Sequence, residues 1–215
     1  ISPGIRDAVA DGYADYTPCF LSEIPSLFQE QILSLDAALV TLSPPDEYGY
    51  CSMGTSVDIV SAAIRSAKKV IAQINPSMPR TCGHSFIHIN EVDAWMEMDE
   101  PVPELKPPEI DPITEQIGQY VSMLIEDGAT LQLGIGNIPD AVLKYLGNHH
   151  DLGVYTEMMS DGVMNLMKKG VITNRNKTFH HGKTITTFCM GTRELYDFVD
   201  ANPHIEFHPS EHVNA

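Results

Sequence analysis

Short apolar runs alternate along the chain with segments in which apolar residues recur every three to four positions. The first pattern is typical of strands buried inside a sheet, and the second of helices that cover one. The apolar runs that predict strands are residues 36–42, 69–74, 86–89, 129–133, 184–189 and 205–207. The segments that predict helices are residues 5–10, 24–28, 57–68, 113–126, 138–146, 161–169 and 193–199. This alternation predicts an α/β fold of open, mostly parallel sheets with flanking helices.

Residues 99–112 interrupt the alternation. The segment holds five prolines and five acidic residues and shows no apolar periodicity, which is typical of an extended linker. We therefore predict the remainder of a first α/β domain over residues 1–98, an acidic proline-rich linker over 99–112, and the start of a second α/β domain over 113–215.

The most informative stretch runs from residue 129 to residue 161. It predicts a strand, a glycine turn, a helix and a second strand that ends at Glu157. Gly134 and Gly136 allow a sharp turn and leave amide hydrogens uncovered at the start of the helix, where Pro139 suits the first helical position. In open α/β sheets ligands bind at the carboxyl ends of the strands, which is where this order puts Glu157.

Two chemical interpretations fit this geometry. In a dinucleotide fold, Gly134 and Gly136 would form the phosphate turn and Glu157 would hold a ribose hydroxyl. Alternatively, Glu157 is a nucleophile and the turn amides form an oxyanion hole. The sequence favours the second, because Pro139 replaces the third glycine and Asp140 adds negative charge at the helix start. The turn alone is also compatible with an ordinary connection that binds nothing.

Composition narrows the classes of partner. The net charge of −16 argues against nucleic acid, and no apolar run approaches the roughly 20 residues that span a bilayer. The four cysteines show no CxxC spacing, so we expect a reduced, cytoplasmic setting. Residues 168–193 hold six basic residues and no acidic one. This local positive charge could bind a phosphorylated ligand such as coenzyme A, or it could belong to an ordinary solvated surface. Lys183 is our candidate from this run.

Other polar residues are weaker candidates. Arg80, in a loop at the predicted carboxyl edge, could bind a carboxylate or phosphate, although a structural role fits it better. Asp46 lies in a proline-rich loop, and such a loop is more often a rigid connection than a binding site. His204, His208 and His212 have the spacing of metal ligands on one helix face, but Pro203 and Pro209 interrupt a helix there. We therefore predict no metal site and no tightly bound cofactor.

Two of the stretches named above carry a resemblance to a known family. LQLGIGNIPDAVL at 131–143 and YTEMMSDGV at 155–163 resemble the acetyl-CoA hydrolase/4-hydroxybutyrate CoA-transferase family, as do ADYTPCFLSEIPSLF, LSPPDEYGYCSMGTSVD, INPSMPRTCG, LIEDGATLQ and MGTRELYDFVDANP. The resemblance implies a NagB/RpiA/CoA-transferase-like fold of two α/β domains, with the catalytic glutamate of the family's TEM motif at Glu157. The residues that we expect to contact coenzyme A are Gly134, Ile135, Gly136, Asn137, Ile138 and Lys183.

The resemblance also implies an activity. We expect a CoA-transferase that moves coenzyme A, its co-substrate, between an acyl-CoA such as acetyl-CoA or butyryl-CoA and a short carboxylate such as acetate or 4-hydroxybutyrate. The reaction would pass through a covalent glutamyl-CoA thioester on Glu157. An acetyl-CoA hydrolase of the same family and a non-catalytic CoA- or nucleotide-binding module are the alternatives. Because family members are about twice as long, we expect a fragment that lacks both ends and is inactive alone, and a homodimer when intact.

Overall fold

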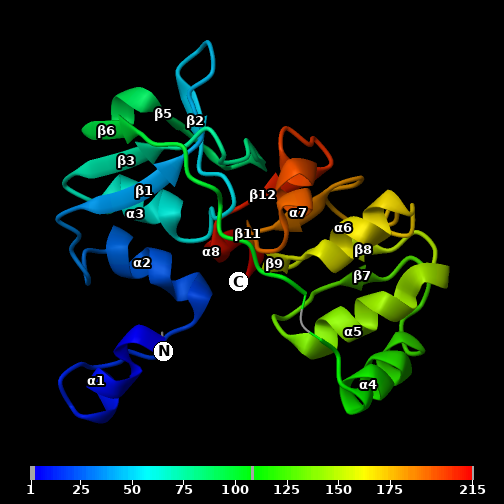
Figure 1. Ribbon diagram of the computed structural model, residues 1–215. Coiled ribbons are helices and arrows are strands. Elements are labelled where there is room, and N and C mark those ends of the chain that lie inside the picture. Colours follow the sequence, from blue (N-terminus) through cyan, green and yellow to red (C-terminus); the bar gives the residue numbers. More distant parts are fainter. Residues whose placement is uncertain (1–2, 108, 215) are drawn as a thin grey trace.

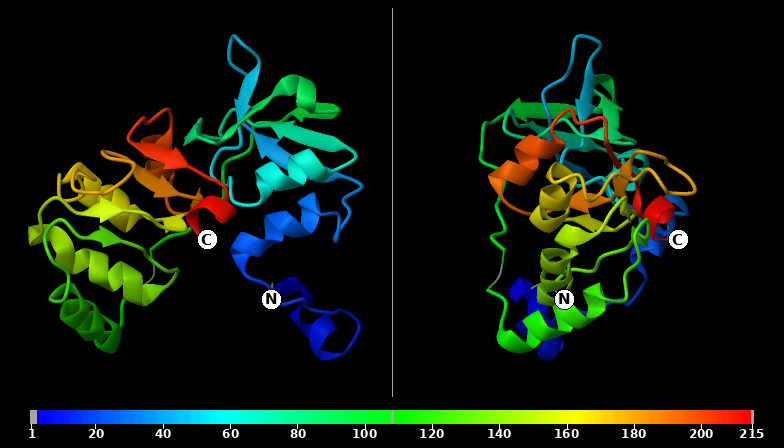
Figure 2. Two further views of the ribbon diagram at one scale, coloured as in Figure 1. Left: turned by 180° about the vertical axis from the view of Figure 1, so that it is seen from behind. Right: turned by 90° about the vertical axis from the view of Figure 1, so that its right-hand side faces the viewer.

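The computed structural model describes residues 3–107 and 109–214 and shows two lobes side by side (Figure 1). Seen from behind, the first helical segment projects from the lower end of the N-terminal lobe, while the C-terminus lies between the lobes (Figure 2). The α/β fold with mostly parallel sheets that the sequence predicts is confirmed.

A parallel sheet in the order β1-β3-β6 forms the centre of the N-terminal lobe. Its strands are β1 (Ala38–Leu42), β3 (Val70–Ile74) and β6 (Ala94–Glu97). The helices of this lobe are α1 (Arg6–Ala10), α2 (Ile24–Gln29) and α3 (Val60–Ser66). The short strands β2 (Tyr50–Ser52) and β5 (Phe86–His88) form a separate antiparallel pair. The apolar runs at 36–42 and 69–74 therefore pair as expected, with Leu42 beside Ile74.

The second lobe is built around the stretch that the sequence singled out. Its elements are α4 (Pro112–Ser122), β7 (Thr130–Leu131), α5 (Asn137–Tyr145), β8 (Gly153–Val154), β9 (Met158–Met159), α6 (Asp161–Lys168), β11 (Phe188–Cys189) and α7 (Arg193–Val199). Asp111 caps α4 by accepting hydrogen bonds from the amides of Ile113 and Thr114. Helix α4 packs against α5 where Gly118 meets Ala141, with no room for a larger side chain.

A third sheet connects the two parts of the chain. Its order is β10-β12-β4, from β10 (Thr184–Thr186), β12 (Ile205–Phe207) and β4 (Cys82–Gly83), all parallel. Buried residues of both lobes also form one hydrophobic cluster, which Val102 of the predicted linker joins. The division at 99–112 stays a prediction, and the two parts share a sheet across it. None of the described helices is long and apolar enough to cross a bilayer.

Candidate active site

The glycine turn and Glu157 lie next to each other because their strands are neighbours. Strands β7 and β8 pair in parallel, with Leu131 beside Val154. Two residues further on, the Thr156 hydroxyl accepts a hydrogen bond from the amide of Leu133 and donates one to its carbonyl, both at 2.9 Å. This register puts the start of the turn at Gly134 alongside Glu157, as the sequence predicted for the carboxyl edge of the sheet.

The turn presents its backbone to an open space. Gly136 is the N-cap of α5 and has φ 135° and ψ −179°, a conformation that essentially only glycine adopts. No atom would lie within 4 Å of a Cβ at Gly134 or Gly136. As in any helix start, the first amides of α5, at Asn137 and Ile138, have no acceptor within the helix. Within the described residues they make no other backbone hydrogen bond, so they are available to an anion.

The backbone of Glu157 is held firmly by the neighbouring chain. Its peptide carbonyl accepts hydrogen bonds from the hydroxyls of Thr186 and Thr187, at 3.0 and 2.9 Å, and from the amide of Thr187 at 3.0 Å. The side chain is half-buried. The residue that we expected to act as nucleophile therefore has a fixed main chain and a carboxylate that is not enclosed in the core.

The carboxylate of Glu157 has a partner that the sequence did not indicate. The side-chain amide of Asn214 donates a hydrogen bond to Oε2 of Glu157 at 2.5 Å. The amide must present its nitrogen, because an ionised carboxylate can only accept. Asn214 follows α8 (Ser210–Val213), and the Tyr155 hydroxyl donates to the carbonyl of His212 at 2.8 Å. This contact ties the end of α8 to the chain just before Glu157.

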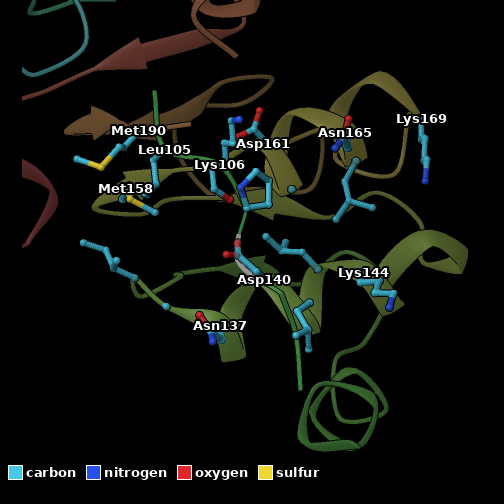
Figure 3. Close-up of a pocket in the computed structure, with 18 residues that line it drawn as sticks. Leu105, Lys106, Asn137, Asp140, Lys144, Met158, Asp161, Asn165, Lys169 and Met190 are labelled. Atoms are coloured by element: carbon cyan, nitrogen blue, oxygen red, sulfur yellow. The ribbon is translucent and has the colours of Figure 1, made fainter. Parts of the chain in front are cut away.

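A cavity of about 500 Å³ extends from the turn along the length of α5 and α6, between the two helices (Figure 3). Ile135, Gly136 and Asn137 line it, together with Met158, which follows Glu157; Glu157 itself is not among the described lining residues. Three lysines also line it: Lys106, Lys144 and Lys169. Asp140 lies there as well, and burial together with the charge of Asp161 raises its pKa. The cavity thus combines apolar walls with three cationic groups.

The basic run at 168–193 is largely paired with acidic residues from other segments. The Nζ of Lys183 donates to the carbonyl of Pro203 at 2.5 Å and lies 3.1 Å from Oε1 of Glu206. Lys177 is buried and donates to the carbonyls of Val154 and Lys183, and burial lowers its pKa to about 8. Of the predicted contacts, the structure therefore places Ile135, Gly136 and Asn137 at the cavity, whereas Lys183 contacts Glu206 of β12.

Arg80 has a structural role, which is the interpretation that the sequence favoured. It pairs with Asp46 at 2.5 Å, donates to the carbonyl of Tyr50 at 2.9 Å and stacks over the ring of Phe86. Asp46 in turn accepts hydrogen bonds from the amides of Tyr48 and Tyr50, which close the proline-rich loop. These contacts engage Nη1 and Nη2 of Arg80 within the protein.

The C-terminal histidines do not share a helix, as Pro203 and Pro209 predicted. Strand β12 ends at Phe207 and α8 begins at Ser210, which leaves His208 on the connection. His208 is only 4% exposed, and burial lowers its pKa to about 4 even though Glu206 accepts a hydrogen bond from it at 3.2 Å. The imidazole is thus neutral in the folded protein at neutral pH.

This buried histidine makes stability depend on pH. The pKa of His208 is about 4 in the folded protein and 6.5 as a reference for the unfolded chain, so the unfolded state binds the extra proton between these values. We expect lowering the pH from 7 to 5 to cost roughly 2 kcal/mol of unfolding free energy through this residue. Urea unfolding at the two pH values should show that loss in the unmodified protein and in His204→Gln, an exposed control. His208→Gln should show a smaller loss, which His212 still causes because burial lowers its pKa as well. Equal losses in all three would contradict it.

A second expected result concerns the turn. Gly136→Ala should destabilise the protein by about 1–3 kcal/mol, because alanine does not tolerate the φ of 135° found there. Gly134→Ala is the matched control, since that glycine lacks a positive φ and has open space around it. Thermal unfolding of the two variants measures the difference. The same melting temperature for both would show that the turn relaxes without cost.

Comparison with known proteins agrees with this geometry. Residues 1–106 match the acetyl-CoA hydrolase/transferase N-terminal domain. The chain is 55% identical over 209 residues to the 4-hydroxybutyrate coenzyme A transferase of Clostridium kluyveri, covering 97% of this chain and 49% of that protein. It is 47% identical to the succinyl-CoA:cyclohexane-1-carboxylate CoA transferase of Geobacter metallireducens, with 97% and 48% covered. The chain spans about half the length of the curated relatives it matches.

Solved structures share the fold over nearly the whole chain. The 4-hydroxybutyrate CoA-transferase of Porphyromonas gingivalis superposes with a TM-score of 0.89 at 43% identity, covering 98% of this chain and 55% of that one. RipA from Yersinia pestis gives 0.92 at 36% identity, with 98% and 50% covered. The strand-turn-helix unit and the sheets around it thus define an α/β fold of the CoA-transferase type. The chain belongs to the acetyl-CoA hydrolase/transferase family.

Proposed function

We propose that the full-length protein is a CoA-transferase that moves coenzyme A between an acyl-CoA, such as acetyl-CoA or butyryl-CoA, and a short carboxylate, such as acetate or 4-hydroxybutyrate. The observation that carries the proposal is the position of the Glu157 carboxylate, half-exposed at the carboxyl edge of a strand and alongside the glycine turn. The relatives named as CoA-transferases support the same chemistry.

The reaction that we propose proceeds through two kinds of covalent adduct on Glu157. Its carboxylate attacks the carbonyl of the acyl-CoA, the thiolate of coenzyme A leaves, and a mixed anhydride forms. The thiolate then attacks the glutamyl carbonyl, which releases the first carboxylate and leaves a glutamyl-CoA thioester. The incoming carboxylate reverses these steps. No general base is required, because a carboxylate is already ionised at neutral pH.

Each step builds negative charge on a carbonyl oxygen, either of the substrate or of Glu157. We assign a hydrogen-bond donor to each of these two oxygens. When Glu157 attacks, the charge develops on the oxygen of the substrate, for which the amides of Asn137 and Ile138 are candidates. When the thiolate attacks the glutamyl carbonyl, the charge develops on the glutamate oxygen that is not bonded to the acyl group. Asn214 already donates to Oε2. A donor of this kind is typically worth about 3 kcal/mol of barrier.

The cavity beside the turn is our candidate binding site for part of coenzyme A. Lys106 and Lys169 supply positive charge where phosphate groups would be stabilised, and the apolar walls suit the rest of a long ligand. Lys144 also lines the cavity, but its ammonium group pairs with Glu115 at 2.6 Å. Residues 134–138 remain candidate contacts, because the turn that they form lies at this cavity. Lys183 also stays a candidate, although its ammonium group contacts Glu206 in this structure.

The test uses the full-length protein with acetyl-CoA and 4-hydroxybutyrate, followed by chromatography of the CoA species. A transferase yields 4-hydroxybutyryl-CoA in excess over free coenzyme A. Free coenzyme A alone would identify a hydrolase, and tight binding of coenzyme A without turnover would identify a binding module. The 215-residue chain alone should show negligible turnover. The homodimer and the cytoplasmic location stay predictions from the sequence and the family.

A further inference from the structure

Three potential metal ligands come together at β12 and the loop that precedes β10. His180 Nδ1, one carboxylate oxygen of Glu206 and a ring nitrogen of His208 all lie within 4.8 Å of one another. Glu206 is in β12 and His208 follows it by two residues, so their side chains share one face of the strand. His180 arrives from the loop before β10, the strand that pairs with β12.

The distances suit a small cation with nitrogen and oxygen ligands. Oε2 of Glu206 lies 3.2 Å from Nε2 of His208 and 3.9 Å from Nδ1 of His180. Two ligands held at zinc-ligand distances in a tetrahedral site are about 3.4 Å apart. The pair of Glu206 and His208 is therefore close to that spacing, and the distance from Glu206 to His180 exceeds it by about 0.5 Å.

The support of the carboxylate also suits a metal. Lys183 contacts Oε1 and leaves Oε2 facing the two histidines. Metal-binding carboxylates are characteristically supported in this way through the second oxygen.

The surroundings strengthen the case. Two more imidazoles lie close by: the ring centroid of His212 is 4.6 Å and that of His84 is 4.7 Å from that of His208. The imidazole of His208 thus has two further imidazoles beside it, in addition to that of His180.

We propose that His180, Glu206 and His208 form a binding site for a divalent transition-metal ion, with Zn²⁺ as the ion that two histidines and one glutamate fit best. Water or a neighbouring imidazole completes the coordination. A bound ion links the loop at His180 to β12 and so to the strand pair that precedes α8. The role is structural and is independent of the transferase reaction.

The test is a titration of chelator-treated full-length protein with Zn²⁺ alone, in competition with a colorimetric chelator. We expect one equivalent per chain, at least about 10-fold weaker binding in His180→Ala and Glu206→Gln, and unchanged binding in His204→Ala, whose residue is exposed. These two variants are used because His208 is buried and its removal could prevent folding. Zn²⁺ should also raise the melting temperature of the unmodified protein but not of Glu206→Gln. Absence of stoichiometric binding, or equal affinity in all variants, would overturn the proposal.

Discussion

Replacing Glu157 with glutamine should abolish CoA transfer by the full-length protein. An amide cannot attack the acyl-CoA carbonyl to form the anhydride, so no covalent route remains through this residue. Loss of a covalent nucleophile lowers kcat by about 10⁴-fold or more. Because glutamine has nearly the same shape and the residue is half-buried, the fold should be retained. Initial rates with acetyl-CoA and 4-hydroxybutyrate measure the effect.

The matched control is Glu126→Gln. Glu126 is exposed, and only its backbone takes part in a described hydrogen bond, with the amide of Ala129. We expect this variant to retain the activity of the unmodified protein. Substantial transfer by Glu157→Gln would place the nucleophile elsewhere in the full-length protein and would leave the cavity and turn as a binding site only.

Replacing Asn214 with alanine should lower kcat by about 10²–10³-fold, the usual cost of losing one oxyanion donor. Its amide donates to Oε2 of Glu157, the oxygen that becomes negative when a nucleophile attacks the glutamyl carbonyl. We therefore expect the loss in discharge of the isolated glutamyl-CoA enzyme by acetate, measured in a single turnover. The KM for acyl-CoA should change little, because the amide touches the glutamate and not the CoA cavity.

Asn90→Ala is the control for this variant, since Asn90 is exposed and no described contact involves its side chain. Discharge of the thioester by Asn214→Ala at the unmodified rate would refute the role of the amide. If the unmodified protein forms no glutamyl-CoA thioester at all, the transferase proposal itself is wrong. Failure of the proposed role of Asn214 can therefore be distinguished from failure of the proposed function.

The strand-turn-helix unit was predictable because its signals are local. Gly134, Gly136 and Pro139 specify a turn and a helix start within a few residues, and Glu157 follows at the end of the next apolar run. Parallel neighbours align their carboxyl ends, so the meeting of turn and glutamate followed from the order of elements alone. The structure confirms this juxtaposition through the register of β7 and β8.

Contacts between distant segments were not predictable in the same way. Asn214 is 57 residues from Glu157 in the sequence, and no spacing rule connects an asparagine after a short helix with a strand end. The basic run shows the same limit. Lys168 and Lys183 look unpaired in the sequence, yet Glu194 and Glu206 fold back onto them.

The histidine cluster could not be predicted from the spacing of His204, His208 and His212. Pro203 and Pro209 correctly argued against one helix through these residues, and the chain there forms β12, a short connection and the short helix α8. In a strand the relevant spacing is two, which pairs Glu206 with His208 on one face. His180, the third residue of the proposed metal site, lies in the loop before β10. Nothing in the sequence connects it with Glu206 and His208.

The most direct test of the central claim is to trap the adduct on Glu157. Full-length protein is incubated with acetyl-CoA, treated with borohydride to reduce a glutamyl thioester, and digested for peptide mass analysis. The account predicts a reduced side chain at Glu157, present only when acetyl-CoA was added and absent from Glu157→Gln. A modification at another carboxylate, or an unmodified Glu157 in protein that is turning over, would contradict it.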